Sequence, residues 1–474
     1  MKSMTGGQAA VAALQAEGVK CVFGLIGSAT MELFDALYDA NDIRFIGVHD
    51  ERTGTHMADG FARASGSAGV ILAGQNGPGA TNLVTGLAQA HAAFSPVVSI
   101  AGALSTEHQY RDAFQEVDQQ ALFKPVTKQT WTVPRTERVP EIFRAAFRTA
   151  LTPRRGPVQV NLPRDVLSDT RTFEELQTPE QYRAASRPGP DPRDIARAAD
   201  KLAEARRPVI VVGGGIKQCQ GQDVLVALAE CLDAPVILSP GHGDALPFDC
   251  PVNAGQMGPR GNPVASRLAR EADVILALGT RLGFNSTFYS YDNINPDASI
   301  IQIELEPTAI GRYFPVEIGI WGDAREAAIQ LHEQLLSKAG RAQADTWFSE
   351  YQQERAEYLN DRERNADSTD YPIQPSGLYS VLRECLPRSA AITLDAGTLC
   401  LQATDALNYY ESPGLFTPLD PEVEREAKGK RRKLPRRERA AMLAERAIEA
   451  TRAYAERVGI PPSSAERPPA EADA

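Results

Sequence analysis

Residues 48–82 read VHDERTGTHMADGFARASGSAGVILAGQNGPGATN, and this stretch decides the fold. Glu51 stands between an apolar run and an amphipathic segment, so we expect it where a buried strand ends and a helix begins. Ligands of parallel α/β sheets bind at that edge, beyond the carboxyl ends of the strands. The Gly-Pro-Gly turn at 77–79, followed by Asn82, offers bare backbone that can approach a flat ring or a phosphate. Taken singly, Glu51 is better explained as a negative charge that stabilises the N-terminus of a helix. The turn, taken singly, is better explained as a turn with a helix cap.

Outward from this stretch, apolar runs alternate with amphipathic segments between Thr5 and Leu167. The apolar runs are CVFGLIG, IRFIGV, GVILAG and VVSIAGA, and the helical segments include AAVAALQAEG and MELFDALYDA. Buried strands spaced by helices predict a parallel sheet covered on both faces. We therefore predict a first domain over residues 1–168. A Pro-rich stretch, SRPGPDP at 186–192, ends the pattern and indicates a linker, which we place at 169–190.

The same pattern returns after the linker. The runs RPVIVVGGGI, APVILS, DVILALGT and SIIQIEL alternate with helical segments and predict a middle Rossmann-like domain at 191–340. A helical connector (341–375) and the incomplete start of a third domain (376–420) follow. The remainder, 421–474, contains a basic run at 428–439 and supports one charged amphipathic helix. The predicted fold class is α/β, with tandem doubly wound parallel-sheet domains, a fragment of a third domain and a charged helical tail.

The composition excludes several classes of protein. The 474 residues favour two to four domains, and 43% hydrophobic with 23% charged residues is ordinary for a globular chain. Fifty Lys and Arg against 61 Asp and Glu give a net charge of -11, which argues against a nucleic-acid binder because phosphates would be repelled. The six cysteines form no CxxC pair, so we expect reduced thiols without a zinc site. We expect a cytoplasmic protein, since neither a leader nor an 18-residue apolar run is evident.

Taken together and in this order, these pieces resemble the thiamine-diphosphate-dependent enzymes of the acetolactate synthase and sulfoacetaldehyde acetyltransferase type. The resemblance runs from Thr5 to about Asp420 and includes RGPVQVNLPRDV, ALGTRLG and IIQIELEP. Three segments are similar to the sulfoacetaldehyde acetyltransferases: the GSA turn at 27–29, HMADGFAR and QNGPG. The motif DAFQE at 112–116 is instead typical of the acetolactate synthases. The subfamily stays open. The resemblance implies that the first domain binds the pyrimidine half of the cofactor.

The resemblance also assigns roles to residues. Glu51 matches the glutamate that hydrogen-bonds the aminopyrimidine and favours its imino tautomer, so that the exocyclic nitrogen can take the proton of the thiazolium carbon. The implied reaction is attack of that carbon on the carbonyl of a 2-oxo acid, with loss of carbon dioxide. From the residues alone, Phe114 is equally consistent with a core position and Lys128 with a surface charge. The implied cofactor-binding residues are Gly27, Ser28, Glu51, Gly77, Pro78 and Asn82, and the implied catalytic residues are Glu51, Phe114, Gln115 and Lys128.

The middle domain carries a weaker signal. Its VVGGGI turn lacks GxGxxG spacing, so the turn alone is weak evidence for a bound nucleotide. The resembling family binds FAD here in some members, and ADP or nothing in others. Arg281 and Glu304 are the residues that would meet a nucleotide. We do not favour FAD, and a flavin at this place would be structural and not redox-active.

The third unit departs from the family. Family members hold the diphosphate through a magnesium ion, using a GDG motif and a later asparagine, and this sequence has neither. The nearest matches, GHGDAL at 241–246 and WGDAREA at 321–327, lie in the middle domain. A hard cation needs an ordered set of oxygen ligands. We therefore predict no metal ligand in this chain, with Mg²⁺ and the diphosphate held by a partner chain, as in a split enzyme.

The predicted function is that of a thiamine-diphosphate-dependent carboligase or decarboxylase subunit acting on a 2-oxo acid or a related carbonyl substrate. We expect a homo-oligomer that also takes a second subunit carrying the diphosphate-binding domain, and neither a membrane nor a nucleic acid as partner. The alternative is a catalytically inactive paralogue that acts as a dimeric scaffold or regulatory binding module. The basic run at 428–439 is either a docking element for an acidic partner or a solvated tail.

Overall fold

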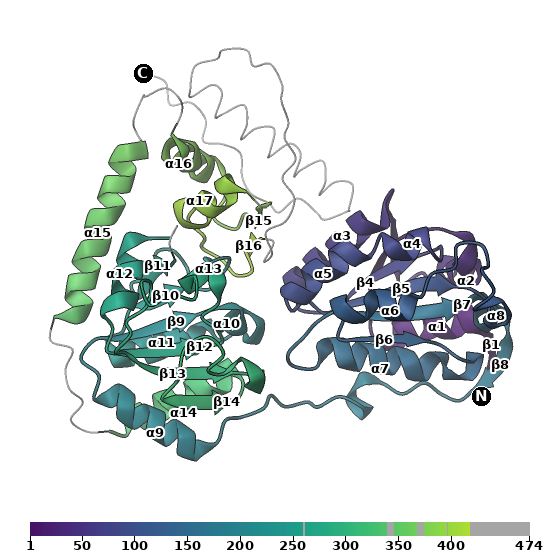
Figure 1. The fold of residues 1–474 in the computed structure, drawn as a ribbon, viewed down its shortest axis with the longest axis horizontal. Coiled ribbons are helices and arrows are strands. Elements are labelled where there is room, and N and C mark those ends of the chain that lie inside the picture. Colours follow the sequence, from purple (N-terminus) through teal and green to yellow (C-terminus); the bar gives the residue numbers. More distant parts are fainter. Residues whose placement is uncertain (259–260, 339–345, 367–373, 396, 418–474) are drawn as a thin grey trace, which may run out of the picture.

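The computed structural model describes residues 1–258, 261–338, 346–366, 374–395 and 397–417. Two six-stranded sheets, both wholly parallel, dominate the described residues (Figure 1). One sheet belongs to the first domain and the other to the middle domain. The predicted tandem α/β fold is therefore confirmed.

The first sheet has the strand order β3-β2-β4-β5-β7-β6. The chain leaves β2 toward β3 on one side and continues through β4 on the other, so the topology reverses between β2 and β4. Open parallel sheets bind ligands at such a switch point, beyond the carboxyl ends of the strands. The strands are β2 (Cys21–Leu25), β3 (Arg44–Gly47), β4 (Gly69–Ala73), β5 (Val97–Ala103), β6 (Gln129–Thr132) and β7 (Val158–Pro163).

Helices cover both faces of this sheet, as the alternating pattern predicts. One face packs against α1, α2 and α7, and the other against α3, α5 and α6, through two separate apolar clusters. A short antiparallel pair, β1 (Lys2–Thr5) and β8 (Thr170–Phe173), lies beside the sheet. The helices are α1 (Gly6–Ala16), α2 (Met31–Tyr38), α3 (Glu51–Ser65), α4 (Pro78–Thr81), α5 (Val84–Ala92), α6 (Gln119–Phe123), α7 (Val139–Leu151) and α8 (Arg164–Ser168).

The middle domain has a sheet of order β11-β10-β9-β12-β13-β14, again with a helix layer and an apolar cluster on each face. Its strands are β9 (Pro208–Val212), β10 (Val236–Leu238), β11 (Asn253–Gln256), β12 (Val274–Leu278), β13 (Ser299–Glu304) and β14 (Ile318–Trp321). Its helices are α9 (Pro192–Ala203), α10 (Gly214–Cys219), α11 (Gln222–Leu232), α12 (Pro263–Glu271), α13 (Phe284–Thr287) and α14 (Ala324–Leu336).

A third, small unit follows the long helix α15 (Trp347–Ala366), which packs along the middle domain (Figure 1). It consists of α16 (Pro375–Cys385), β15 (Ile392–Thr393), α17 (Thr398–Ala406) and β16 (Leu415–Phe416). The two strands pair in parallel around a small apolar cluster. The charged helix predicted for 421–474 lies outside the described residues. Within the described ranges, every helix is too short or too polar to cross a membrane.

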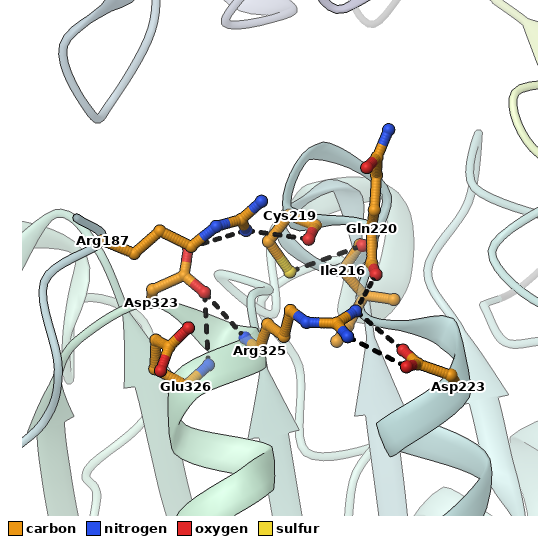
Figure 2. A network of polar contacts seen from close by, with 8 residues as sticks. All are labelled: Arg187, Ile216, Cys219, Gln220, Asp223, Asp323, Arg325 and Glu326. Atoms are coloured by element: carbon orange, nitrogen blue, oxygen red, sulfur yellow. Dashed lines mark hydrogen bonds and ion pairs between the residues drawn. The ribbon is translucent and has the colours of Figure 1, made fainter. Parts of the chain in front are cut away.

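Arg187, which precedes α9, is attached to the middle domain by a polar network (Figure 2). Arg187 donates a hydrogen bond of 2.7 Å to the carbonyl oxygen of Cys219 and forms an ion pair of 3.5 Å with Asp323. The Asp323 side chain is buried and caps α14, accepting two backbone N–H groups of its first turn at 2.9 and 3.3 Å. In that turn, Arg325 forms a second ion pair, with Asp223 of α11, at 2.7 Å. Arg187 is thus bound to the start of α14.

Asp323 should contribute measurably to stability through this cap. Asp323→Ala removes the acceptor from a helix start, which should lower the free energy of unfolding by about 1–2 kcal/mol. Asp323→Asn keeps a capping oxygen and loses only the ion pair with Arg187, so its loss should be smaller. Chemical denaturation of both variants measures the difference. An equally large loss in both would assign the effect to the ion pair and not to the cap.

Candidate functional site

Two backbone turns meet at the carboxyl ends of β2 and β4. Ala29 N donates to Gly74 O at 3.0 Å, and Gly74 N donates to Leu25 O at 2.9 Å. A Cβ added at Gly27 would lie 2.5 Å from the carbonyl carbon of Gly74, and one added at Gly74 would lie 2.0 Å from the nitrogen of Gly27. Such contacts are too short for any side chain, so both positions require glycine. This close approach forms the floor of the candidate site at the switch point.

Glu51 lies at the same edge, as the first residue of α3. Its side chain is only 5% exposed. Asn82 Nδ2 donates to Glu51 Oε2 at 3.0 Å, so these two predicted residues are in direct contact. The backbone at Gly79 passes so close that a Cβ there would lie 3.1 Å from Glu51 Oε1. One carboxylate oxygen is therefore held by Asn82, while the other faces the bare backbone of the Gly-Pro-Gly turn.

The Gly-Pro-Gly turn has a backbone at its first residue that favours glycine. Gly77 has φ 56° and ψ -109°, a conformation that L side chains rarely adopt. Pro78 then occupies the first turn of α4, where its missing N–H costs nothing, and is exposed. A Cβ at Gly77 would lie 2.5 Å from the carbonyl oxygen of Gln115. The turn therefore packs directly against the loop that carries the predicted substrate-facing residues.

That loop, residues 110–116, is held in a strained backbone by two polar side chains. Gln115 has φ 61°, a left-handed value that is uncommon outside glycine. Asn76, which is 5% exposed, donates from Nδ2 to Gln115 O at 3.0 Å. From within the loop, Glu116 accepts the backbone N–H of Tyr110 at 2.6 Å and that of Ala113 at 3.0 Å. The loop presents Phe114 with 79% exposure, so Phe114 is not a core residue.

The loop should loosen in acid because its anchor is a carboxylate. The hydrogen bonds from Tyr110 N–H, and then from Ala113 N–H, lower the pKa of Glu116. With a depressed folded-state pKa, the stabilisation is present above the unfolded pKa of about 4.3 and is lost as the pH falls through the folded value. Hydrogen exchange of these two amides, relative to their intrinsic rates, should therefore accelerate in that range. The variant Glu116→Gln should lack the transition; a loop equally protected at all pH values would contradict this role.

Lys128 is the predicted residue that the structure does not bring to this edge. It precedes β6 in the parallel sheet and so lies at the amino ends of the strands. Its ammonium donates to the carbonyl oxygens of Thr149, Thr152 and Arg154 at 2.6, 3.0 and 2.7 Å, at the end of α7. Burial lowers the pKa of Lys128 to about 8. These contacts give Lys128 a structural role, and its contact with a substrate stays a prediction.

Two side chains that the sequence did not single out complete the site. Gln75 and Asn76, the first residues of QNGPG, connect the floor with the loop: Ser28 Oγ donates to Gln75 Oε1 at 2.9 Å, and Gln75 Nε2 donates to Gln115 Oε1 at 2.6 Å. Their position directly before the Gly-Pro-Gly turn was the available signal. The structure thus gathers one cluster at the switch point, composed of Gly27, Ser28, Glu51, Gln75, Asn76, Gly77, Pro78, Asn82, Phe114 and Gln115.

In the middle domain, Arg281 and Glu304 both line a cavity of about 450 Å³ that also reaches the first domain. The Arg281 guanidinium lies 4.8 Å from the ring centroid of Phe94. Burial raises the pKa of Glu304. The cavity includes the glycine turn at 213–215, so bare backbone and a cation face the same space. The two residues named from the sequence are together, and the identity of a ligand here stays a prediction.

Comparison with known proteins gives the family. Residues 4–122 match the family described as thiamine pyrophosphate enzyme, N-terminal TPP binding domain, and residues 195–331 match its central domain. A probable acetolactate synthase large subunit of Methanocaldococcus jannaschii is 36% identical over 406 residues, which is 83% of this chain and 67% of the relative.

Two further relatives represent both types named above. A probable sulfoacetaldehyde acetyltransferase of Rhizobium meliloti is 34% identical over 439 residues, 88% of this chain and 73% of the relative. The acetolactate synthase isozyme 3 large subunit of Escherichia coli is 32% identical over 402 residues, 84% of this chain and 69% of the relative. The chain therefore belongs to the thiamine pyrophosphate (thiamine diphosphate) enzymes of the acetolactate synthase and sulfoacetaldehyde acetyltransferase type.

Proposed function

We propose that this protein is a carboligase or decarboxylase subunit that uses thiamine diphosphate on a 2-oxo acid or a related carbonyl substrate. The observation that carries the proposal is the buried Glu51 at the switch point, with one oxygen held by Asn82 at 3.0 Å and the other facing the turn at 77–79. Bound thiamine diphosphate supplies a carbon nucleophile and an electron sink for the bond beside a carbonyl. The remaining tasks fall to the protein's own residues.

The residues present fit the pyrimidine half of this cofactor. Glu51 Oε1 accepts no hydrogen bond from the described residues, and it is not sealed from solvent, so it can take an N–H of an aminopyrimidine. A Cβ at Gly79 would lie 3.1 Å from that oxygen, so glycine keeps side-chain carbon away from it. Asn82 orients the carboxylate, and Pro78 of the neighbouring turn is exposed. Glu51 would then hold a proton at the ring nitrogen, the arrangement that general acid–base catalysis requires.

The sequence has no GDG motif, through which the family holds the diphosphate end of the cofactor. We propose that a partner chain supplies the diphosphate-binding domain and its Mg²⁺. Relatives named as large subunits support assembly with a second polypeptide. We assign no flavin to the cavity lined by Arg281 and Glu304.

Binding of the pyrimidine half alone tests the proposal without any partner. Saturation-transfer NMR with thiamine detects weak binding, and the ring methyl group should receive saturation from the protein. Oxythiamine, in which a carbonyl replaces the amino group, should bind less because Glu51 and the turn would meet an altered hydrogen-bonding edge. Folded protein that transfers no saturation to thiamine would contradict the cofactor assignment and favour the inactive scaffold. Turnover of a 2-oxo acid only after a partner chain is added would support the split enzyme.

A further inference from the structure

Four polar side chains at the site form a chain of hydrogen bonds with one fixed direction. Asn76 Nδ2 donates to two backbone carbonyl oxygens, those of Gln115 at 3.0 Å and Phe114 at 3.4 Å. Carbonyl oxygens only accept, so the NH₂ group of Asn76 must face them and its Oδ1 must face the other way. This anchor settles which end of the amide is oxygen, a choice that heavy-atom positions alone leave ambiguous.

The direction propagates from Asn76 to the loop. Because Asn76 Oδ1 is an acceptor, its neighbour at 3.1 Å must be the NH₂ group of Gln75. The same Nε2 of Gln75 lies 2.6 Å from the amide of Gln115, which must therefore present its oxygen. The other end of Gln75, Oε1, accepts the hydroxyl of Ser28 at 2.9 Å. Each amide in the chain thus has one possible orientation.

The fixed orientation of these amides determines which atom of the Gln115 side chain is free. Its Oε1 is engaged by Gln75, and its Nε2 has no hydrogen-bond partner in the part of the chain that the structure describes. Gln115 is partly exposed, and its backbone packs against the turn at Gly77 beside Glu51. An NH₂ group held in this way is a donor that can bind water or an acceptor group of a ligand.

We propose that Gln75 is a positioning residue that fixes Gln115 as a hydrogen-bond donor to an anionic oxygen of the substrate. The inference rests on the proposed function and adds the chemistry of the recognised group: an anionic oxygen, from a carboxylate bonded to the reacting carbonyl or from a sulfonate one carbon away from it. Both offer acceptor oxygens with negative charge, and hydrogen bonds to charged groups are stronger than neutral ones. An amide turned the other way would present its oxygen to that anion and repel it.

The kinetic test uses two variants of Gln75 in the assembled holoenzyme. Gln75→Glu has no donor, so Gln115 should turn its NH₂ toward the new carboxylate and its oxygen toward the substrate. Gln75→Met has a similar length and leaves Gln115 free in both orientations. We expect KM for pyruvate, the probe 2-oxo acid, to rise about tenfold to hundredfold in Gln75→Glu and less in Gln75→Met, which is the range for loss of one hydrogen bond to a charged group. The fold-change in kcat should be smaller than that in KM.

Acetaldehyde is the internal control, because it has the reacting carbonyl and lacks the anion. In both variants the fold-change in its KM should be smaller than that for pyruvate. Sulfoacetaldehyde, measured alongside pyruvate, shows which anion the donor serves by which KM responds. Equal changes for pyruvate, sulfoacetaldehyde and acetaldehyde would overturn the positioning role, since a general structural defect acts on all three.

A second readout needs no turnover. In protein labelled with ¹⁵N-glutamine, the side-chain NH₂ signal of Gln115 is assigned by its loss in Gln115→Met. We expect this signal to shift in Gln75→Glu without any ligand, as the NH₂ group gains a carboxylate partner, and to shift in the wild type when pyruvate is added. An unchanged signal in Gln75→Glu would refute the proposal that Gln75 fixes the orientation of Gln115. Absence of all turnover in the wild-type assembly would instead refute the proposed function, so the two failures are distinguishable.

Discussion

Replacement of Glu51 by Gln should slow proton exchange at the thiazolium carbon of bound thiamine diphosphate by about 10²–10⁴-fold, the range that a positioned acid–base group contributes. Glutamine keeps the shape of the side chain and can still accept the hydrogen bond from Asn82. It lacks the charge that would stabilise a protonated ring nitrogen, so the exocyclic nitrogen would be a poorer base. Exchange of the carbon-bound proton for deuterium, followed by NMR in the assembled complex, measures the effect directly.

A matched control comes from the same domain. Glu141 is also an acidic residue in the first turn of a helix, α7, and its partner is Arg138 at 2.5 Å on the surface. If Glu51 acted only through the helix dipole, Glu51→Gln and Glu141→Gln should behave alike. We expect normal exchange in Glu141→Gln and cofactor affinity within about tenfold of wild type in Glu51→Gln. Unchanged exchange in Glu51→Gln would remove the basis of the assignment.

The fold of the first two domains could be predicted because the local pattern of apolar and polar residues indicates which segments are strands and which are helices. The runs around 21–25 and 69–73 are apolar throughout, as strands buried on both faces require, and they form neighbouring parallel strands. Parallel topology then brings every strand's carboxyl end to one edge. Glu51 follows a strand end in sequence, so its place beside the turn at 77–79 follows from order alone.

The hydrogen bonds within the site could not be predicted, because they join residues that are far apart in the chain. Gln75 and Gln115 are 40 positions apart, and their contact depends on a left-handed backbone at a residue that is not glycine. The sequence DAFQE does not indicate that the Glu116 carboxylate stabilises this backbone by accepting hydrogen bonds from two N–H groups. Lys128 shows a different limit of sequence reasoning. The resemblance names it as a site residue, whereas the strand direction places it at the other edge of the sheet.

Gly77→Ala should cost both stability and cofactor binding. The backbone at Gly77, with φ 56° and ψ -109°, is unfavourable for alanine, which should lower the free energy of unfolding by about 1–3 kcal/mol. The new Cβ would also lie 2.5 Å from the carbonyl oxygen of Gln115 and 2.8 Å from its Cβ. Relief of that contact must move either the turn beside Glu51 or the loop that carries Phe114. We therefore expect the Kd for thiamine diphosphate in the assembled complex to rise at least about tenfold, or 1.4 kcal/mol.

The control for Gly77→Ala is the same substitution at Gly60, in the middle of α3 in the same domain. A Cβ at Gly60 would meet nothing within 4 Å, and alanine favours a helix interior over glycine by up to about 1 kcal/mol. Gly60→Ala should therefore raise the free energy of unfolding slightly and leave the Kd unchanged. Denaturation curves and calorimetric titrations of both variants make the comparison. A Gly77→Ala protein that binds thiamine diphosphate as tightly as Gly60→Ala would show that the cofactor does not depend on this turn, because the two substitutions add the same methyl group.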